Sequence, residues 1–379
     1  MKLTAYIRIY FYLPSFLARG IETNTENRSL QWRNGIKKRK HNEDPTPAQQ
    51  ELPSPIIFLA RSVKADTRFT VFKQEFHLHS SGLKHHSDHF RKVLDSADKK
   101  PAPAYALFKY DYRSVIDEDG SWALMPASDM TLVDGLEEEI EAVRKLLCAI
   151  HSKNYRIETA DELKRLTRLA DYYCALPVVS ATLTGALFKC RIFKGLLATY
   201  NALTGEHDDE CVSLLLLARK LRHGVLFKEF LIHTVGRWDS LPDLEKEVVK
   251  DDQQLYKLVQ TKLILLCKIV AKTQGALLMA LCDGQGELYK IFECNYSSLL
   301  IGRRISMYRA LYNEHVFGSF SDEETKEELS DLISSLLKNN LALDCTGKDS
   351  GGENVFENTF LCSEMEGDEL PWDLEGMDW

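Results

Sequence analysis

The chain has 379 residues, of which 44% are hydrophobic and 10% aromatic, enough to bury a core in one or two domains and too apolar for disorder throughout. Its formal net charge of −8 argues against a dedicated nucleic-acid binder, because such proteins usually carry a basic surface. The 9 cysteines form no CxxC pair, which indicates reduced thiols in a cytoplasmic or nuclear protein.

Residues 1–55 are predicted to form a disordered leader. Arg8 interrupts the apolar opening MKLTAYIRIYFYLPSFLARG and no small-residue cleavage site stands out, so we expect no signal peptide. Residues 20–55 are polar and end in the proline-punctuated PTPAQQELPSP. They include the basic cluster Lys37, Lys38, Arg39 and Lys40, which has the composition of a nuclear import signal and is explained equally well as a solvated charge run.

Residues 56–190 carry strand signals followed by helix signals, which predicts an α+β domain. TRFTVF and EFHLH alternate as strands do, and Leu83, Phe90 and Leu94 in the next segment have helical spacing. YALFKYDYRSVI and SWALMPAS flank a DEDG turn, which predicts an inserted β-hairpin at about 105–126. Helical spacing begins at residue 136, a capping box starts a helix at Thr159, and Pro177 separates that helix from the next.

Residues 191–343 are predicted to be an all-helical domain. CVSLLLLARKLR, LFKEFLIHTVGRW, LYKLVQTKLILLCKIVAKTQGALLMALC and TKEELSDLISSLLKNNLAL have the spacing of amphipathic or buried helices. We interpret LILLC and GALLMALC as parts of buried helices, too short for the ~20 apolar residues of a membrane span, so no membrane partner is expected. Residues 344–379 become acidic and are predicted to form a tail.

The stretch QEFHLHSSGLKHHSDHF, residues 74–90, holds five of the 11 histidines. His77 and His79 would share a face of a strand, and His85 and His89 are i, i+4 neighbours on a helix, a spacing that some zinc sites use. Against a metal site, Asp88 is the one acid near the helical pair, no cysteine is near, and no HExxH pattern is present. We therefore assign no metal ligands.

Catalytic motifs are absent from the sequence. There is no GxGxxG after a strand, no GxxxxGK[ST], no GxSxG and no kinase motif set. The carboxylates of LEEEIE are most simply the solvated face of an amphipathic helix. We expect no enzyme, no cofactor and no small-molecule substrate.

Several separated blocks resemble one family, the BTB/POZ domain. The resemblance is carried by an aspartate before the first strand and by F-x-x-H-x-x-x-L-x-x-x-S-x-x-F, here Asp66, Phe76, His79, Leu83, Ser87 and Phe90. Later positions that resemble the family are Leu146, Leu147, Ile150 and Tyr155. The resemblance covers roughly residues 59–190 and is closest to fungal BTB proteins, which also show an FKYDY…DEDGSW-like hairpin and a KLRHGVLFKEFLIHTVGRW-like helical stretch.

The resemblance implies a small sheet flanked by helices that binds other proteins, homodimers included, without catalysis. It implies that His79 lies between the second strand and the first helix, where an imidazole can bond backbone groups. The segment DSADKKPAPAY lacks the apolar-x-Glu sequence with which cullin-recruiting BTB domains contact their scaffold, so a cullin partner is not expected.

The sequence therefore predicts a protein–protein interaction module or adaptor: a BTB/POZ-like domain at 56–190, a helical domain at 191–343 and disordered termini. One alternative is a nuclear regulator that uses KKRK for import and the tail for binding a co-regulator. Another is a metal-dependent protein that uses the histidine cluster.

Two structural predictions accompany this assignment. Five residues are expected to form one buried cluster between the sheet and its helices: Phe76, Leu83, Phe90, Leu146 and Leu147. The acidic, aromatic tail is expected to be disordered and to contact a partner through Trp372, Leu374 and Trp379. The alternative for the tail is that its tryptophans pack on the chain's own helical domain.

Overall fold

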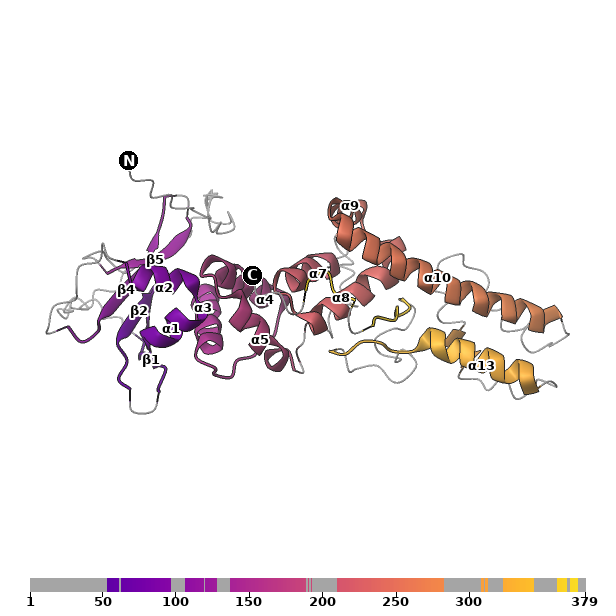
Figure 1. Ribbon diagram of the computed structural model, residues 1–379, viewed down its shortest axis with the longest axis horizontal. Helices are drawn as coiled ribbons and strands as arrows, with labels where there is room; N and C mark the ends of the chain where they lie inside the picture. The colour runs from indigo at the N-terminus through magenta and orange to yellow at the C-terminus, as the bar shows by residue number, and fades with distance from the viewer. Residues whose placement is uncertain are drawn as a thin grey trace, which may run out of the picture. The chain divides into compact units, whose positions relative to one another are not determined.

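The computed structural model describes residues 53–60, 63–96, 106–118, 120–127, 137–188, 190, 192, 210–282, 308–309, 311–312, 323–343, 360–366 and 369–373. Within these ranges the fold is mixed α+β, with one five-stranded sheet and ten α-helices (Figure 1). The basic cluster at 37–40, together with Leu374 and Trp379, lies outside the described residues.

The chain divides into two compact units. The first contains the residues up to His85 and Phe90–Ile140, and the second contains His86–His89 and the residues from Glu141 onward. The division cuts helix α3 (Glu137–Ile150) instead of falling at residue 190. This division groups residues by their contacts and does not test where independently folding domains begin and end. The predicted domain ranges 56–190 and 191–343 therefore stay predictions.

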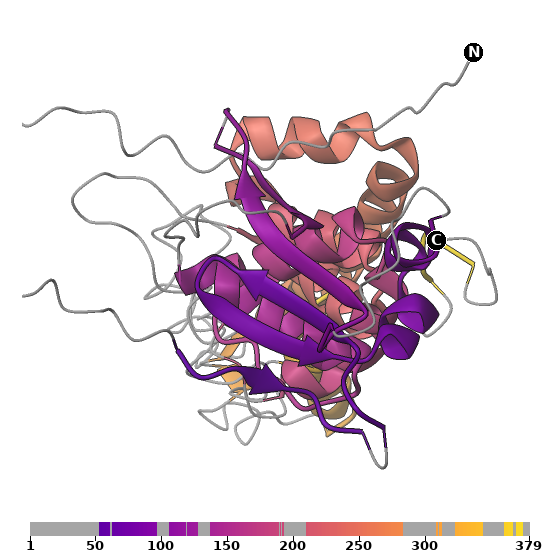
Figure 2. The ribbon, with the colours of Figure 1, turned by 90° about the vertical axis from the view of Figure 1, so that its left-hand side faces the viewer.

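The sheet has the strand order β1-β3-β2-β4-β5 (Figure 2). Its strands are β1 (Ile56–Ile57), β2 (Thr67–Val71), β3 (Gln74–Leu78), β4 (Tyr110–Ile116) and β5 (Trp122–Pro126). β2 and β3 form an antiparallel hairpin, and the chain then passes through α1 (Ser80–His86) and α2 (Asp88–Leu94) before β4 pairs in parallel with β2. The hairpin expected at 105–126 is present as the antiparallel pair β4–β5.

Alternation along the strands separates an apolar face from a polar face. On the apolar face, the ring of Phe69 lies 5.3 Å from that of Phe90 and 5.8 Å from that of Tyr112. In the β4–β5 turn, Gly120 adopts a φ of 81°, which glycine accepts at little cost, and the amide of Asp117 donates to the carbonyl of Ser121 at 2.7 Å. The turn residues thus explain the register of this hairpin.

Helices α4 (Ala160–Tyr172) and α5 (Leu176–Ala186) follow the predicted signals. The hydroxyl of Thr159 accepts from the amide of Glu162 at 3.3 Å, so the predicted cap is present, and the Glu162 carboxylate accepts from the amide of Glu158 at 2.7 Å. Pro177 lies in the first turn of α5, where its missing N–H costs nothing.

The described part of 191–343 is helical, as predicted. It contains α7 (Cys211–Lys220), α8 (Gly224–Gly236), the short 3-10 helix η1 (Trp238–Ser240), α9 (Asp243–Asp251), α10 (Gln253–Cys282) and α13 (Glu323–Leu337). Helix α10 packs against α8, α9 and α13, and Figure 1 shows α13 alongside it.

Helix α10 corrects one sequence prediction. LILLC and GALLMALC belong to one helix of 30 residues, because Gly275 alone does not interrupt it. By length and composition, residues 253–280 are the one described helix that could cross a membrane, with a mean hydropathy of 1.6 over the best 18-residue window. Only 17% of that window is buried, so the apolar segments are not the buried helices that we expected.

All five residues of the predicted core are buried, at 4% exposure or less. Phe76, Leu83 and Phe90 belong to the first unit, and Leu146 and Leu147 belong to the second. Their packing as a single cluster therefore stays a prediction.

Candidate protein-interaction site

Asp66 connects the first hairpin to α1. One oxygen of its carboxylate accepts from the amide of Ser80 at 2.7 Å, and the other accepts from the Ser80 hydroxyl at 2.5 Å. Burial would raise the pKa of Asp66, but the hydrogen bonds from Ser80 and Thr67 outweigh it and hold the pKa below its ordinary value. Asp66 thus caps α1 from a position fourteen residues earlier in the chain, which local sequence patterns do not reveal.

His79, to which the sequence assigned this connection, is buried between β3 and α1, and its carbonyl accepts from the amides of Gly82 and Leu83. Its side-chain role stays a prediction. Ser87 follows α1 and is also buried, and its hydroxyl donates to the carbonyl of Tyr173 at 2.5 Å. Ser87 and Tyr173 thus join two segments of the second unit that are far apart in the sequence.

The histidines of residues 74–90 have separate surroundings. The Nε2 of His77 lies 3.2 Å from a Glu75 carboxylate oxygen, and its ring is 4.7 Å from that of Phe108. The His89 ring packs edge-on against Tyr173 at 5.2 Å. Among the residues that the structure describes, no three His, Cys, Asp or Glu side chains are grouped as a metal site requires.

The polar face of the sheet carries a charge network that the sequence analysis missed. The guanidinium of Arg68 donates to both carboxylate oxygens of Asp111, at 3.0 and 2.5 Å, and lies 3.7 Å from Glu75. The hydrogen bond that Arg68 donates to Asp111 raises the pKa of Arg68. Period-two alternation places Arg68, Glu75, His77 and Asp111 on this face, and that signal could have identified it.

In the second unit, part of the predicted disordered tail packs on α8. We use the name tail segment for residues 360–366 and 369–373. Phe360 is 1% exposed, its ring is 5.0 Å from the His233 ring, and the Arg237 guanidinium lies 5.5 Å from its centre. The prediction of a disordered tail does not hold for these residues, because large aromatic side chains gain free energy from any apolar surface within reach.

The second half of the tail segment has its own contacts. The Trp372 ring meets Phe227 of α8 edge-on at 5.1 Å, so this predicted contact residue packs on its own chain. Lys262 of α10, with 4% of its side chain exposed, pairs with Glu369. Burial would raise the pKa of Glu369, but the hydrogen bond from Lys262 outweighs it and lowers the pKa.

Gly236, the last residue of α8, explains how closely the tail segment approaches. A Cβ at this position would lie 2.3 Å from Cδ2 of Phe360 and 2.6 Å from the carbonyl oxygen of Leu361. Only a residue without a side chain leaves room for both. The chain preceding the tail is held on the same helix, since the buried Glu229 accepts from the amides of Ala342 and Leu343 at 2.8 and 3.0 Å.

His223 begins α8 and was also missed. Its Nδ1 accepts from the amide of Leu226 at 3.1 Å, and its Nε2 lies 2.9 Å from the Thr184 hydroxyl. Burial lowers the pKa of His223 to about 4. The ring must be neutral to accept from Leu226, so its protonation would remove the cap of α8.

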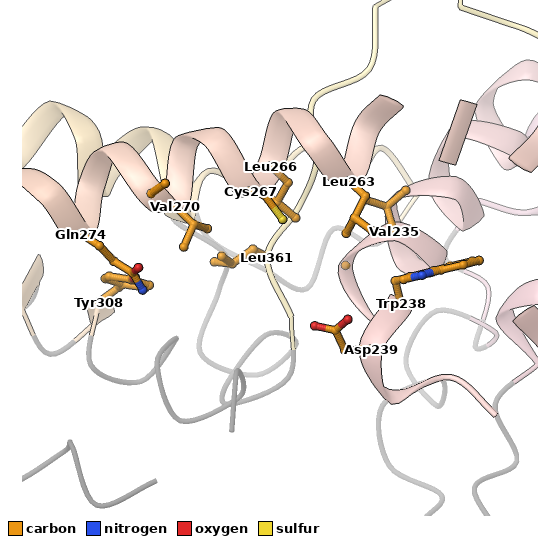
Figure 3. A pocket seen from close by; sticks show the side chains of 12 residues that line it. Val235, Trp238, Asp239, Leu263, Leu266, Cys267, Val270, Gln274, Tyr308 and Leu361 are labelled. Carbon is orange, nitrogen blue, oxygen red and sulfur yellow. The ribbon is translucent and has the colours of Figure 1, made fainter. Parts of the chain in front are cut away.

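An apolar cavity of about 210 Å³ lies beside the tail segment (Figure 3). Its walls come from the end of α8 and η1, from α10, and from Tyr308 and Leu361; the residues are Val235, Gly236, Trp238, Asp239, Leu263, Leu266, Cys267, Val270, Ala271, Gln274, Tyr308 and Leu361. The amide of Gln274 donates to the Tyr308 hydroxyl at 3.2 Å. With Asp239 as the one carboxylate among the described lining residues, the cavity suits an apolar side chain better than acid–base chemistry.

Comparison of the chain with family models, with curated proteins and with solved structures finds no match.

Proposed function

We propose that this chain is a non-catalytic protein–protein interaction module or adaptor, built on a BTB/POZ-like domain and acting in the cytoplasm, the nucleus or both. The observation that carries the proposal is the path of the chain through the sheet. After the β2–β3 hairpin, two helices carry the chain over so that β4 runs parallel to β2. Parallel neighbours require such a crossover, and the residues of the proposed signature line this one.

The signature residues support the proposal through what they contact. Asp66 holds the start of α1 by two hydrogen bonds to Ser80. Phe76 and Leu83 are fully buried, one on β3 and the other on α1. These contacts give a physical reason for an aspartate at 66, a phenylalanine at 76 and a leucine at 83.

Exposed apolar residues lie at the edge of the sheet, and we propose them as the surface for a protein partner. Ile57 and Leu59 point outward from β1 and its continuation, with 50% and 76% of each residue exposed, while Phe58 between them is buried. Val63, at 59% exposure, lies in the short turn that follows. We call Ile57, Leu59 and Val63 the edge patch. Grouped apolar side chains beside an edge strand favour a protein partner, a second copy of this chain included.

The test compares two full-length variants with wild type. Leu59→Ser with Val63→Ser removes most of the edge patch, and Leu244→Ser on α9 is the control because Leu244 is 75% exposed. Light scattering after size exclusion measures self-association, and affinity purification with mass spectrometry identifies partners. We expect the edge-patch variant to lose association that Leu244→Ser keeps. A wild-type chain that is monomeric and enriches no protein above an unrelated bait would refute the proposal.

The nuclear-regulator alternative receives less support. Its import signal at 37–40 lies outside the described residues, and the half-buried Trp372 already contacts Phe227 of its own chain. The described cysteines, which include Cys148, Cys211 and Cys362, are free thiols, in keeping with either compartment.

A further inference from the structure

The composition of α10 differs from that of the whole chain. Gln253–Cys282 contains no Asp or Glu, although the chain has a net charge of −8. It has four lysines, at 257, 262, 268 and 272. Only Lys262 forms an ion pair among the described residues, with Glu369. The helix is therefore a basic, apolar element in an acidic protein.

Helix α10 has a buried face and an exposed face, both at helical spacing. The buried face is formed by Leu255, Val259, Lys262, Leu266, Thr273, Leu277 and Ala280. We call the exposed face between Ile264 and Met279 the outer stripe; it consists of Ile264, Leu265, Lys268, Lys272, Gly275, Leu278 and Met279.

The outer stripe is about 22 Å long at 1.5 Å per residue, with one exposed apolar pair at each end and Lys268 and Lys272 between the two pairs. Ile264, Leu265, Leu278 and Met279 are 55%, 44%, 58% and 68% exposed. Single exposed apolar residues are ordinary on protein surfaces, but a row on one helix face with an apolar pair at each end indicates a contact surface. Lys268 and Lys272 lie in the middle of the row and form no ion pair with the residues that the structure describes.

We propose that the outer stripe binds an acidic amphipathic helix of a partner protein. This surface lies in the second unit, whereas the edge patch lies in the first. Variants of one surface therefore test it separately from the other. Aliphatic residues at i, i+3, i+4 and i+7 of a partner helix would contact the apolar pairs of the stripe. Carboxylates of the same helix would neutralise Lys268 and Lys272.

An acidic amphipathic helix of the chain already packs on the opposite side of α10. Helix α13 is acidic and amphipathic: it buries Leu329, Ile333 and Leu336 and packs against α10. Its Glu327 and Glu328 are exposed. The tail segment adds Glu369, which pairs with Lys262. An acidic amphipathic helix therefore suits the outer stripe, which none of the described residues covers.

Two other occupants fit less well. An antiparallel pair of α10 helices centred near residue 270 would place Lys268 opposite Lys272 of the second copy, and like charges there oppose pairing. An anionic bilayer would find only two lysines, Lys268 and Lys272, on the stripe of a chain whose net charge is −8, whereas one helix about 10 Å wide can cover the stripe alone.

The experiment uses the full-length chain and one defined probe, a labelled synthetic peptide of residues 321–340, SDEETKEELSDLISSLLKNN. Fluorescence anisotropy measures its affinity for wild type, for Lys268→Glu with Lys272→Glu, and for Gly275→Glu. A Cβ at Gly275 meets nothing within 4 Å, so that variant places a negative charge in the stripe without a clash. Lys250→Glu on α9 is the control, because Lys250 is exposed and lies outside the stripe.

We expect both stripe variants to weaken binding by about tenfold or more, which corresponds to ~1.4 kcal/mol, and the control to stay near wild type. Chemical acetylation, mapped by mass spectrometry, gives a second measurement. In the free chain, Lys268 and Lys272 should be acetylated as fast as Lys250. Bound peptide should slow the acetylation of Lys268 and Lys272 and leave that of Lys250 unchanged.

Four results would overturn the proposal. The peptide could fail to bind, or it could bind equally to the stripe variants, which would place it at the α13 site. Slow acetylation of Lys268 and Lys272 in the free chain would mean that another part of the chain covers the stripe. Stripe-dependent binding to vesicles of 30% phosphatidylserine and 70% phosphatidylcholine, with none to the peptide, would identify a membrane surface instead. Loss of the edge patch should change none of these readings.

Discussion

Replacing Gly236 by alanine gives the sharpest test of how the tail segment packs. A glycine-to-alanine change in a helix normally stabilises a protein by about 0.5–1 kcal/mol, because alanine has less backbone freedom to lose on folding. At Gly236 the new methyl group would overlap the Phe360 ring and the Leu361 carbonyl oxygen. The Leu361 carbonyl belongs to the backbone and cannot rotate away from the new methyl group as the end of a side chain can. We therefore expect the tail segment to leave its site.

The size of the effect follows from what is lost. Removing a buried phenylalanine ring costs about 3–5 kcal/mol, and the helix propensity of alanine returns about 0.5–1 kcal/mol. We therefore expect Gly236→Ala to lower the free energy of unfolding by about 2–4 kcal/mol, a change opposite in sign to the usual one. Gly185→Ala and Gly275→Ala are matched controls, because a Cβ at either position meets nothing within 4 Å.

Chemical denaturation of the full-length variants measures the free energies, and amide hydrogen exchange reads the tail directly. Residues 360–373 should lose protection in Gly236→Ala and keep it in both controls. If Gly236→Ala is as stabilising as the controls, or if these amides remain protected, then the tail segment does not lie against the end of α8 and the reasoning fails.

Three further predictions concern other parts of the chain. Leu83→Ala should cost about 2–5 kcal/mol in chemical denaturation because Leu83 is fully buried, and a loss under ~0.5 kcal/mol would contradict its place in the core. His79→Ala should lower the melting temperature, because His79 is buried, whereas the exposed His85→Ala should not; stoichiometric zinc in the purified protein, lost in both variants, would revive the metal alternative. Burial lowers the pKa of His223 to about 4, so the unfolded chain binds its proton first and stability should fall as the pH drops from 6.5 toward 4, by at most about 3 kcal/mol. His223→Asn, which keeps a cap acceptor without a titrating ring, should flatten that part of the stability profile, and parallel profiles for the two proteins would contradict the assignment.

Sequence patterns predicted the parts of the fold that local chemistry determines. The DEDG turn specified the β4–β5 hairpin, Thr159 specified the start of α4, and Pro177 specified the break before α5. Each signal acts within a few residues of its effect, so a single sequence is sufficient to find it.

The remaining features depend on contacts between distant residues. Phe360 is buried because Gly236, far earlier in the chain, leaves space for it, and the acidic residues around Phe360 gave the opposite indication. Ile264 and Leu278 of α10 have the composition of a core, but their exposure depends on which neighbours are present. Hydrophobicity alone does not distinguish a side chain that packs inside the protein from one on its surface.

The two attachments on α8 also determine how the protein would tolerate changes in chain length. The chain leaves α8 after Leu343, which is held by Glu229, and returns at Phe360 beside Gly236. Those two points on the helix are separated by about 10 Å at 1.5 Å per residue. A reporter domain that replaced the residues after 359 would therefore remove the contacts of Phe360 and Trp372 and leave only the attachment at Glu229.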